Sequence, residues 1–397
     1  MSAKVQTLDL EEDRPQRYSE HELSEASAVA ISKTPQCKVE FPNPLNGRKY
    51  IVRAERIAGL VPISNELLLR IKPKVPIGNV FAMLAAVRGL EFIGKQPGVG
   101  SLGTIEQMFD FVAREFAERV IARVRKGLYS QYVGHAERAY VVRGRLEVAS
   151  TLRLRARGDV RVACTYETTT PDILDNQVIL WALDRIARVG LRTAAALERV
   201  RAARRALLGT VSLTECTAAD CRARSYNRLN EDYRILHALA RFFLEAMGPR
   251  LAVGEYQFVP FKLTMWSLFQ DYVVATIRAQ LPSDFVLHRQ RPVELGGAFK
   301  PYKIDALIAD AHTERPLAVI DAKYTRDPHS ASEDVNQVVA YATYTGAKLA
   351  ILVYPTSRPT NVTTLATGIR LCTMGLPLEG DLAASGERFC QELFGLL

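Results

Sequence analysis

The chain has 397 residues, enough for two or three domains, and its shares of hydrophobic (48%) and charged (24%) residues are ordinary for a globular protein. No apolar run approaches the roughly 18 residues that a membrane helix needs. The polar, acidic N-terminus lacks the basic and then apolar pattern of a signal peptide. We therefore expect a cytoplasmic protein with no membrane partner.

The formal net charge of +9 is unevenly distributed along the chain. Residues 131–250 contain twenty basic and thirteen acidic side chains, and all twenty basic ones are arginine. Such a region fits a polyanion such as nucleic acid, or an acidic protein surface, although arginine also simply keeps helices solvated. The six cysteines are scattered without a CxxC motif or a histidine cluster, which favours buried free thiols over zinc or disulfides.

The N-terminal part is expected to be an α+β domain over residues 1–130. An irregular lead with a short helix around 21–30 precedes half-buried strands within 37–75, including the alternating stretch 67–72. Helical periodicity follows at 78–90 and at 104–128, where Thr104 is a plausible N-cap. The stretch 89–96 fits the G-x-x-x-x-G-K string, but a helix precedes it and Gln96 replaces the hydroxyl of a phosphate-binding loop. We therefore expect this chain to bind no nucleotide itself.

Residues 131–250 are expected to form an Arg-rich, largely helical middle region. Strands are predicted at 139–154 and 160–168, and helices at 172–189, 191–208 and 227–248. Two groups of arginines are candidates for contacting nucleic acid or a protein partner. They are Arg143 and Arg145, which would share one strand face, and Arg201, Arg204 and Arg205 on the second helix. Ordinary solvated arginines are an equally good explanation for the first pair.

The pattern changes to an α/β alternation over residues 251–397. A helix is predicted at 262–280, strands at 285–289, 302–310 and 317–325, a helix at 333–345 and a strand at 348–355. This order predicts a mixed sheet flanked by helices, in a chain that combines α/β and α+β domains.

The third of these strands carries charges that an apolar strand would not ordinarily contain. Asp321 and Lys323 are two residues apart and therefore share a face, and a hairpin would bring Asp305 beside them. Two close carboxylates repel each other, and a divalent cation such as Mg²⁺ or Mn²⁺ relieves the repulsion. The carbonyl of Ala322 could add a ligand, and Lys323 could orient or deprotonate a bound water. The chemistry implied is phosphodiester hydrolysis. The alternative without a function is a surface ion pair of Asp321 and Lys323, with Asp305 nearby by chance.

The spacing D-x15-D-x-K on adjacent apolar strands resembles the PD-(D/E)xK nuclease superfamily, whose core is a mixed sheet like that of restriction endonucleases. On the next predicted helix, Gln337 and Tyr341 match the Q-x-x-x-Y element of its RecB-like branch. This resemblance implies that both residues lie near the metal and the DNA.

Longer blocks in a fixed order resemble the McrC family, the nuclease subunits of McrBC-type modification-dependent restriction systems. The blocks are LLLRIKPKVPIGNVFAML at 67–84, VVRGRLEVASTLRL at 141–154, TPDILDNQVILWAL at 170–183, NRLNEDYRILHALARFFL at 227–244 and the nuclease core at 302–355. The resemblance implies that Asp305, Asp321 and Lys323 are catalytic and that double-stranded DNA is the substrate. It also implies a hexameric McrB-like AAA+ GTPase as partner, onto which the N-terminal part would dock to stimulate GTP hydrolysis. A RecB-like repair nuclease and a non-catalytic activator of an AAA+ ring remain as alternatives.

The sequence departs from the family pattern at two places near the expected site. Ile304 stands where the family has Pro before the first catalytic Asp, which should be tolerable because that residue ligates nothing. The family's Leu-Phe-Glu on the helix entering the nuclease fold is here Leu268-Phe269-Gln270, followed by Asp271. One step along a helix turns a side chain by about 100°, so whether Gln270 or Asp271 replaces the usual acid stays open.

Overall fold

The computed structural model describes residues 6–64, 66–90, 103–189, 191–222, 224–247, 261–293, 302–325 and 331–397. The chain divides into two compact units, which do not coincide with the ranges predicted from sequence. The first comprises Met1–Met108, Ala246–Tyr256 and Pro260–Leu397, and the second comprises Phe109–Glu245 and Gln257–Val259. The N-terminal 108 residues thus share a unit with the C-terminal part. Most of the stretch 89–96 lies outside the described residues, and no described helix is long and apolar enough to cross a membrane.

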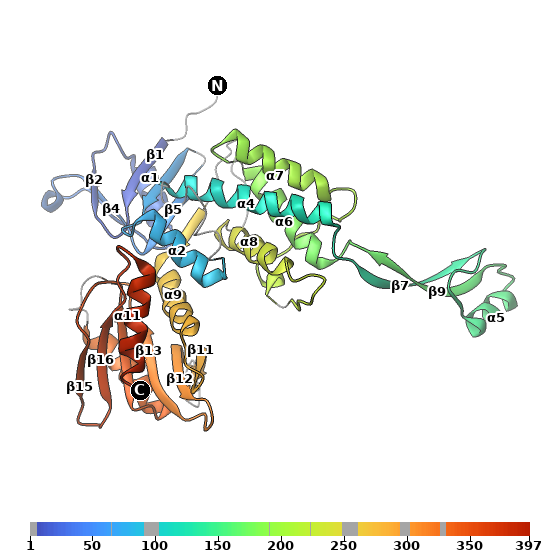
Figure 1. Ribbon diagram of the computed structural model, residues 1–397. Helices are drawn as coiled ribbons and strands as arrows, with labels where there is room; N and C mark the ends of the chain where they lie inside the picture. Colours follow the sequence, from blue (N-terminus) through green and yellow to red (C-terminus); the bar gives the residue numbers. More distant parts are fainter. Residues whose placement is uncertain are drawn as a thin grey trace. The chain divides into compact units, whose positions relative to one another are not determined.

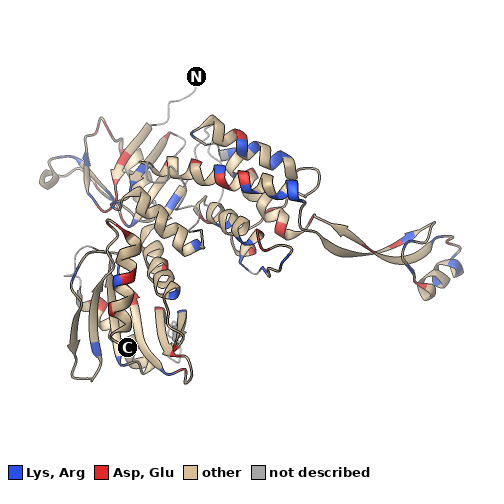
Figure 2. Cartoon of the chain, viewed as in Figure 1, with Lys and Arg blue, Asp and Glu red and all other residues tan. Residues whose placement is uncertain are grey.

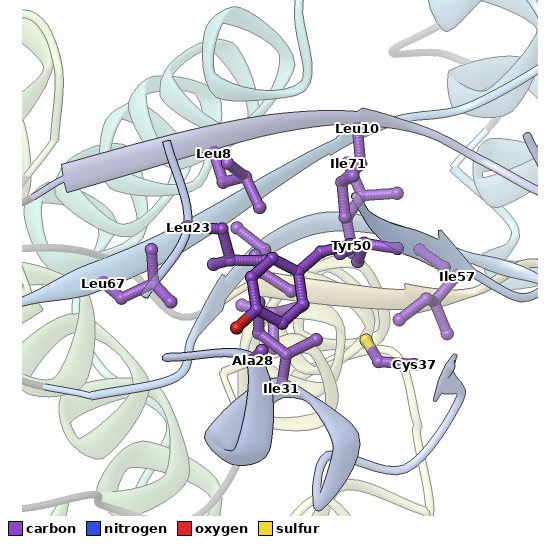
Figure 3. Packing of buried hydrophobic residues seen from close by; sticks show 14 residues of the cluster. Leu8, Leu10, Leu23, Ala28, Ile31, Cys37, Tyr50, Ile57, Leu67 and Ile71 are labelled. Carbon is purple, nitrogen blue, oxygen red and sulfur yellow. The ribbon is translucent and has the colours of Figure 1, made fainter. Parts of the chain in front are cut away.

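Two small sheets form the N-terminal part of the first unit (Figure 1). One has the order β1-β6-β5-β10, in which β1 is parallel to β6 and the other neighbours are antiparallel. The other has the order β2-β4-β3. Leu8, Leu67 and Ile71 from the first sheet pack around Tyr50 of the second and against Ile31 of α1 (Figure 3). The bounds are β1 (Gln6–Glu11), β2 (Gln16–Tyr18), α1 (Glu25–Ser32), β3 (Cys37–Glu40), η1 (Pro44–Asn46), β4 (Tyr50–Ala54), β5 (Ile57–Pro62), β6 (Leu67–Lys72) and β10 (Phe261–Thr264).

Strand β10 corrects the predicted helix 262–280. The helix itself, α9, spans Met265–Ala279, and the residues before it pair with β5 instead, Lys262 opposite Gly59. Gly59 has φ +125°, and a Cβ there would lie 1.9 Å from the Phe261 carbonyl oxygen. Only glycine allows this backbone approach. The C-terminal region therefore begins as a strand of the N-terminal sheet.

Two further helices follow the N-terminal sheets at positions that the sequence predicts closely. They are α2 (Ile77–Arg88) and α4 (Ile105–Lys126). The Thr104 hydroxyl accepts a hydrogen bond from the Gln107 amide at 3.3 Å, which confirms Thr104 as a cap.

The C-terminal sheet has six strands in the order β11-β12-β13-β14-β16-β15 (Figure 1). The pairs β11–β12, β12–β13 and β15–β16 are antiparallel, whereas β13–β14 and β14–β16 are parallel, so the predicted mixed sheet is confirmed. Helix α10 covers the sheet through Val338, Tyr341 and Ala342. The sequence reading missed β15, β16 and α11. The bounds are β11 (Phe285–Val293), β12 (Tyr302–Asp310), β13 (Pro316–Ala322), α10 (Ala331–Thr345), β14 (Leu349–Tyr354), β15 (Asn361–Thr364), β16 (Arg370–Gly375) and α11 (Leu382–Phe394).

The second unit combines helices with a three-stranded sheet of order β7-β9-β8. The long strands β7 and β9 form a ribbon that carries α5 at its end (Figure 1). The predicted strand at 139–154 is wrong, because this stretch contains a loop, the two-residue strand β8 and α5. Gly144, at φ +68°, breaks the expected alternation. The bounds are β7 (Gln131–Ala139), β8 (Arg145–Leu146), α5 (Val148–Ala156), β9 (Val162–Thr170), α6 (Leu174–Val189), α7 (Ala194–Leu207), η3 (Ala219–Cys221) and α8 (Tyr233–Ala246).

The cysteines behave as the sequence predicts. All six are buried and free, and burial raises the pKa of the Cys37 thiol to about 11 and that of Cys390 to about 12.

Candidate active site

The hairpin of β12 and β13 brings the two predicted aspartates together. The antiparallel register pairs Ala306 with Ile320, so Asp305 and Asp321 are the next residues along the two strands and lie side by side. Residues opposite each other in an antiparallel pair share a face. Strand β13 is largely apolar and is buried between its neighbouring strands and α10. The Asp321 side chain is buried with it.

Asp305 is held by two hydrogen-bond donors. Its Oδ2 accepts from the Ala322 amide at 2.9 Å and from the Gln270 side chain at 3.1 Å. Gln270 lies on α9, so the helix that enters the C-terminal sheet reaches the site through an amide. Gln270 stands where the family pattern has a glutamate, and its side chain donates a hydrogen bond to Asp305.

Lys323 follows β13 directly and is enclosed by acceptors. Its Nζ lies 2.8 Å from Asp321 Oδ2 and 3.2 Å from Asp334 Oδ1, and it donates to Gln337 Oε1 at 2.6 Å. Gln337 in turn donates to the Tyr341 hydroxyl at 2.7 Å. Asp334, Gln337 and Tyr341 are three and four residues apart on α10 and therefore share one helix face. The structure thus brings both predicted α10 residues to the site.

Burial and neighbouring charges raise the pKa of both carboxylates. Burial, followed by repulsion from Asp321, raises the pKa of Asp305 to about 7. Burial also raises the pKa of Asp321, although the Lys323 ammonium opposes this. Burial lowers the pKa of Lys323, but Asp321 and Asp334 outweigh it, so the net pKa is raised. Lys323 is therefore protonated at neutral pH and acts here as a positive charge and hydrogen-bond donor.

The donor set is compatible with a hard divalent cation. Asp321 is buried, and Lys323 Nζ, 2.8 Å from its Oδ2, is the one cation paired with this carboxylate among the described residues. Two adjacent carboxylates and a backbone carbonyl suit Mg²⁺, which keeps several waters. Within the described ranges, no three His, Cys, Asp or Glu side chains form a metal-binding group, and Gln270 beside Asp305 contributes an amide donor in place of a carboxylate. The carbonyl of Ala322 as a ligand stays a prediction.

Asp271 does not join this constellation, and one of the predicted arginines has a structural partner within its own unit. Asp271 forms an ion pair with Arg289 of β11 and makes no recorded contact with Asp305 or Asp321. Arg143 lies in the loop before β8, so the prediction that it shares a strand face with Arg145 is wrong.

On α7, Arg204 is ion-paired at 2.8 Å with the buried Asp184, whereas Arg201 and Arg205 are exposed. Figure 2 shows basic residues along α7 and around α5. The contact of any of these arginines with nucleic acid or a partner protein stays a prediction.

The sequence did not predict Asp334, and it left the role of Gln270 open. Asp334 lies three residues before Gln337, a spacing that places both on one face of α10, so the signal was present. The inward direction of Gln270 could not be read from sequence, because the helix phase relative to β12 depends on how α9 packs.

Comparisons with known proteins give one family and a fold likeness. The family model of the McrBC 5-methylcytosine restriction system component matches residues 52–355. A chain of the "refined half-complex from tetradecameric assembly of Thermococcus gammatolerans McrB AAA+ hexamers with bound McrC" is 16% identical, with a TM-score of 0.57, over 99% of this chain and 100% of that chain.

A chain of the cryo-EM structure of the Thermococcus gammatolerans McrBC complex is also 16% identical, over 70% of this chain and 89% of that chain, with a TM-score of 0.46. No curated protein matches the sequence. The first structural likeness is one of fold.

Proposed function

The chain belongs to the family of McrBC 5-methylcytosine restriction system components, and from this membership we propose that it is the subunit that cuts double-stranded DNA. The observation that carries the proposal is the meeting of Asp305, Asp321 and Lys323 at the β12–β13 hairpin, where a buried, raised-pKa carboxylate pair faces a protonated lysine. Charges of this kind are costly in an apolar strand unless a ligand uses them. A PD-(D/E)xK nuclease site accounts for all three.

The residues of this chain have separable roles in the proposed reaction. Asp305 and Asp321 would hold Mg²⁺ or Mn²⁺, which when bound polarises a phosphodiester and lowers the pKa of a water. The Ala322 amide and Gln270 fix the orientation of Asp305. Lys323, positively charged, would orient the water and stabilise negative charge on the phosphate. Gln337 and Asp334 hold its ammonium in place, and Tyr341 supports Gln337.

The proposed partner is a hexameric McrB-like AAA+ GTPase. Support comes from the family and from the fold shared with a chain of an assembly of McrB AAA+ hexamers with bound McrC. In this proposal the partner supplies nucleotide hydrolysis and recognition of modified DNA, and this chain stimulates the hydrolysis and cuts. The N-terminal part would carry the docking surface.

Lys323→Ala tests the proposed cleavage site. The complete complex is incubated with GTP, Mg²⁺ and duplex DNA with or without 5-methylcytosine, and product formation is followed on gels. Cleavage should fall roughly 10²- to 10⁴-fold, while stimulation of the partner's GTP hydrolysis persists. Lys348→Ala, at an exposed lysine just before β14, is the matched control and should cleave normally. Normal cleavage by Lys323→Ala would refute the site assignment.

The same assay separates the two alternatives. A non-catalytic activator would stimulate the partner's hydrolysis but would yield no DNA cleavage with Mg²⁺ or Mn²⁺ in the wild type. A RecB-like repair nuclease would cut in a manner that depends on DNA ends and is indifferent to the GTPase. Cleavage that requires both GTP and the partner supports the restriction function.

A further inference from the structure

The residue after Lys323 joins the candidate site to the N-terminal sheet. Tyr324 is buried, and its hydroxyl donates to Glu12 Oε2 at 3.2 Å across 312 positions of sequence. Glu12 directly follows β1, and its amide donates to the Lys72 carbonyl at the end of β6. The chain leaving β13 is therefore anchored at the end of another sheet, one residue beyond the lysine.

The surroundings of Tyr324 leave this contact little freedom. The Lys74 amide donates to the same Glu12 oxygen at 3.1 Å, and Lys74 Nζ lies 4.1 Å from the centre of the Tyr324 ring. The Phe269 ring of α9 packs on Tyr324 with centroids 5.9 Å apart. The Lys323 backbone is thus fixed in two ways. Its amide donates to the Val353 carbonyl of β14, and the next residue, Tyr324, is anchored to Glu12.

A second route connects the same corner of the N-terminal sheet to Asp305. The side chain of Asp13 accepts from the Arg56 amide at 2.9 Å, and the Arg56 carbonyl accepts from the Met265 amide at 2.9 Å. Met265 begins α9, whose Gln270 donates to Asp305. Both strands of the β12–β13 hairpin are therefore tied to the turn that follows β1.

Burial of the Glu12 carboxylate lowers the stability of the fold more than a purely structural contact requires. It is 3% exposed, and its Oε1 accepts no hydrogen bond from the described part of the chain. A buried, half-satisfied carboxylate is destabilising relative to a well-packed apolar side chain. Such a group is understandable where it holds a functional element in place.

We propose that Glu12 and Tyr324 are positioning residues for Lys323, and that the N-terminal sheet is thereby part of the scaffold of the DNA-cleavage site. The inference rests on the proposed cleavage function and deepens it. Cleavage then depends on the N-terminal sheet directly, and not only through a partner bound to it.

Three variants of the full chain, in its complex with the AAA+ partner, test the link. Tyr324→Phe keeps the ring and removes the donor, and Glu12→Ala removes the acceptor. Glu12→Gln keeps an oxygen that accepts from Tyr324 and from Lys74. We expect kcat for DNA cleavage to fall roughly 10- to 100-fold in the first two, with KM for DNA changed by less than about threefold. Glu12→Gln should restore most of the rate.

Leu8→Ala is the control for general loss of stability, because Leu8 is buried in the hydrophobic cluster of the same sheet, and this cluster contains neither Glu12 nor Tyr324. All variants are assayed well below their unfolding temperatures. If Leu8→Ala lowers kcat as much as Tyr324→Phe at equal stability, the effect is not positional and the proposal fails.

Hydrogen exchange provides a readout that does not need cleavage. Exchange of the peptide spanning 319–325, measured by mass spectrometry, should accelerate in Glu12→Ala and Tyr324→Phe and stay near wild type in Glu12→Gln. Unchanged exchange in the first two variants would overturn the link even if Lys323→Ala abolishes cleavage. Accelerated exchange in these two variants, together with a wild type that never cuts DNA, would instead count against the cleavage function alone.

Discussion

The candidate site and the β7–β9 ribbon depart from ordinary burial in opposite directions. At the site, Asp321 is only 4% exposed within an apolar strand. Along the ribbon and its connections, large apolar side chains are exposed, such as Tyr132 at 75% and Tyr140 at 78%. Charged side chains of the site are held by specific neighbours, whereas side chains of the ribbon contribute little to a core. Changes at the site should therefore alter stability and chemistry together, and changes in the ribbon and its connections should alter stability less.

A pair of matched glycines gives the largest expected contrast. Gly59 and Gly158 both have positive φ, but a Cβ at Gly59 meets the Phe261 backbone, and one at Gly158, after α5, meets nothing within 4 Å. Gly59→Ala should cost roughly 3 kcal/mol or more in unfolding free energy, because it adds a backbone clash to the conformational strain. Gly158→Ala should cost about 1 kcal/mol. Urea unfolding measures both, and equal losses would contradict the role given to the β5–β10 pair.

Asp305→Asn should stabilise the protein at pH 8 without metal. The pKa of Asp305 is raised to about 7 from 3.8, so between these values the folded state binds more protons and stability falls as the pH rises. The amide removes this loss, a gain on the order of 1–3 kcal/mol. Mg²⁺ should raise the unfolding temperature of the wild type at pH 8 and not that of Asp305→Asn.

Asp159, near the end of α5, is the opposite case and serves as the control. The Arg161 side chain lowers its pKa to about 2, so its contribution to stability is present above pH 3.8 and is lost as the pH falls through 2. Asp159→Asn should therefore slightly lower the unfolding temperature at pH 8. If both amides shift stability in the same direction, the contrast between the two regions is wrong.

Asp334→Asn should weaken cleavage about tenfold, which corresponds to about 1.4 kcal/mol of activation free energy. The substitution removes one of the two carboxylates that hold the Lys323 ammonium and raise its pKa. Single-turnover cleavage by the complete complex measures the rate. Glu333→Gln, at the exposed neighbouring position, should cleave like the wild type. Equal rates for the two variants would remove Asp334 from the site.

The smallest effect is expected from the double substitution Arg143→Gln and Arg145→Gln. Both side chains are exposed, so the unfolding free energy should change by less than about 0.5 kcal/mol. If they contact DNA phosphates, the slope of log affinity for DNA against log salt concentration should become shallower by roughly one unit per arginine. Fluorescence anisotropy at several salt concentrations measures this slope. An unchanged salt dependence would exclude that contact.

Arg204→Gln should instead lower stability, because it leaves the buried Asp184 with one ion-pair partner fewer.

Much of the site could be predicted because its residues are local in sequence. Asp321 and Lys323 share a strand end, Asp305 lies one hairpin away, and Gln337 and Tyr341 are one helical turn apart. Asp334 obeys the same helical spacing and was predictable too. The strand prediction at 139–154 was wrong because Val141 and Val142 suggest a strand, whereas both are exposed in the loop before β8. Without burial, apolar residues carry little information about secondary structure.

The sequence by itself determined the family, the mixed C-terminal sheet and the meeting of two aspartates and a lysine, because these depend on strand alternation, hairpin register and helical period. Only the tertiary structure decided that Gln270 faces Asp305 while Asp271 pairs with Arg289, and that Glu12 reaches Tyr324. The first depends on the rotation of α9 against the sheet. The second joins residues 312 positions apart, and such contacts follow from the packing of whole elements and not from any local pattern.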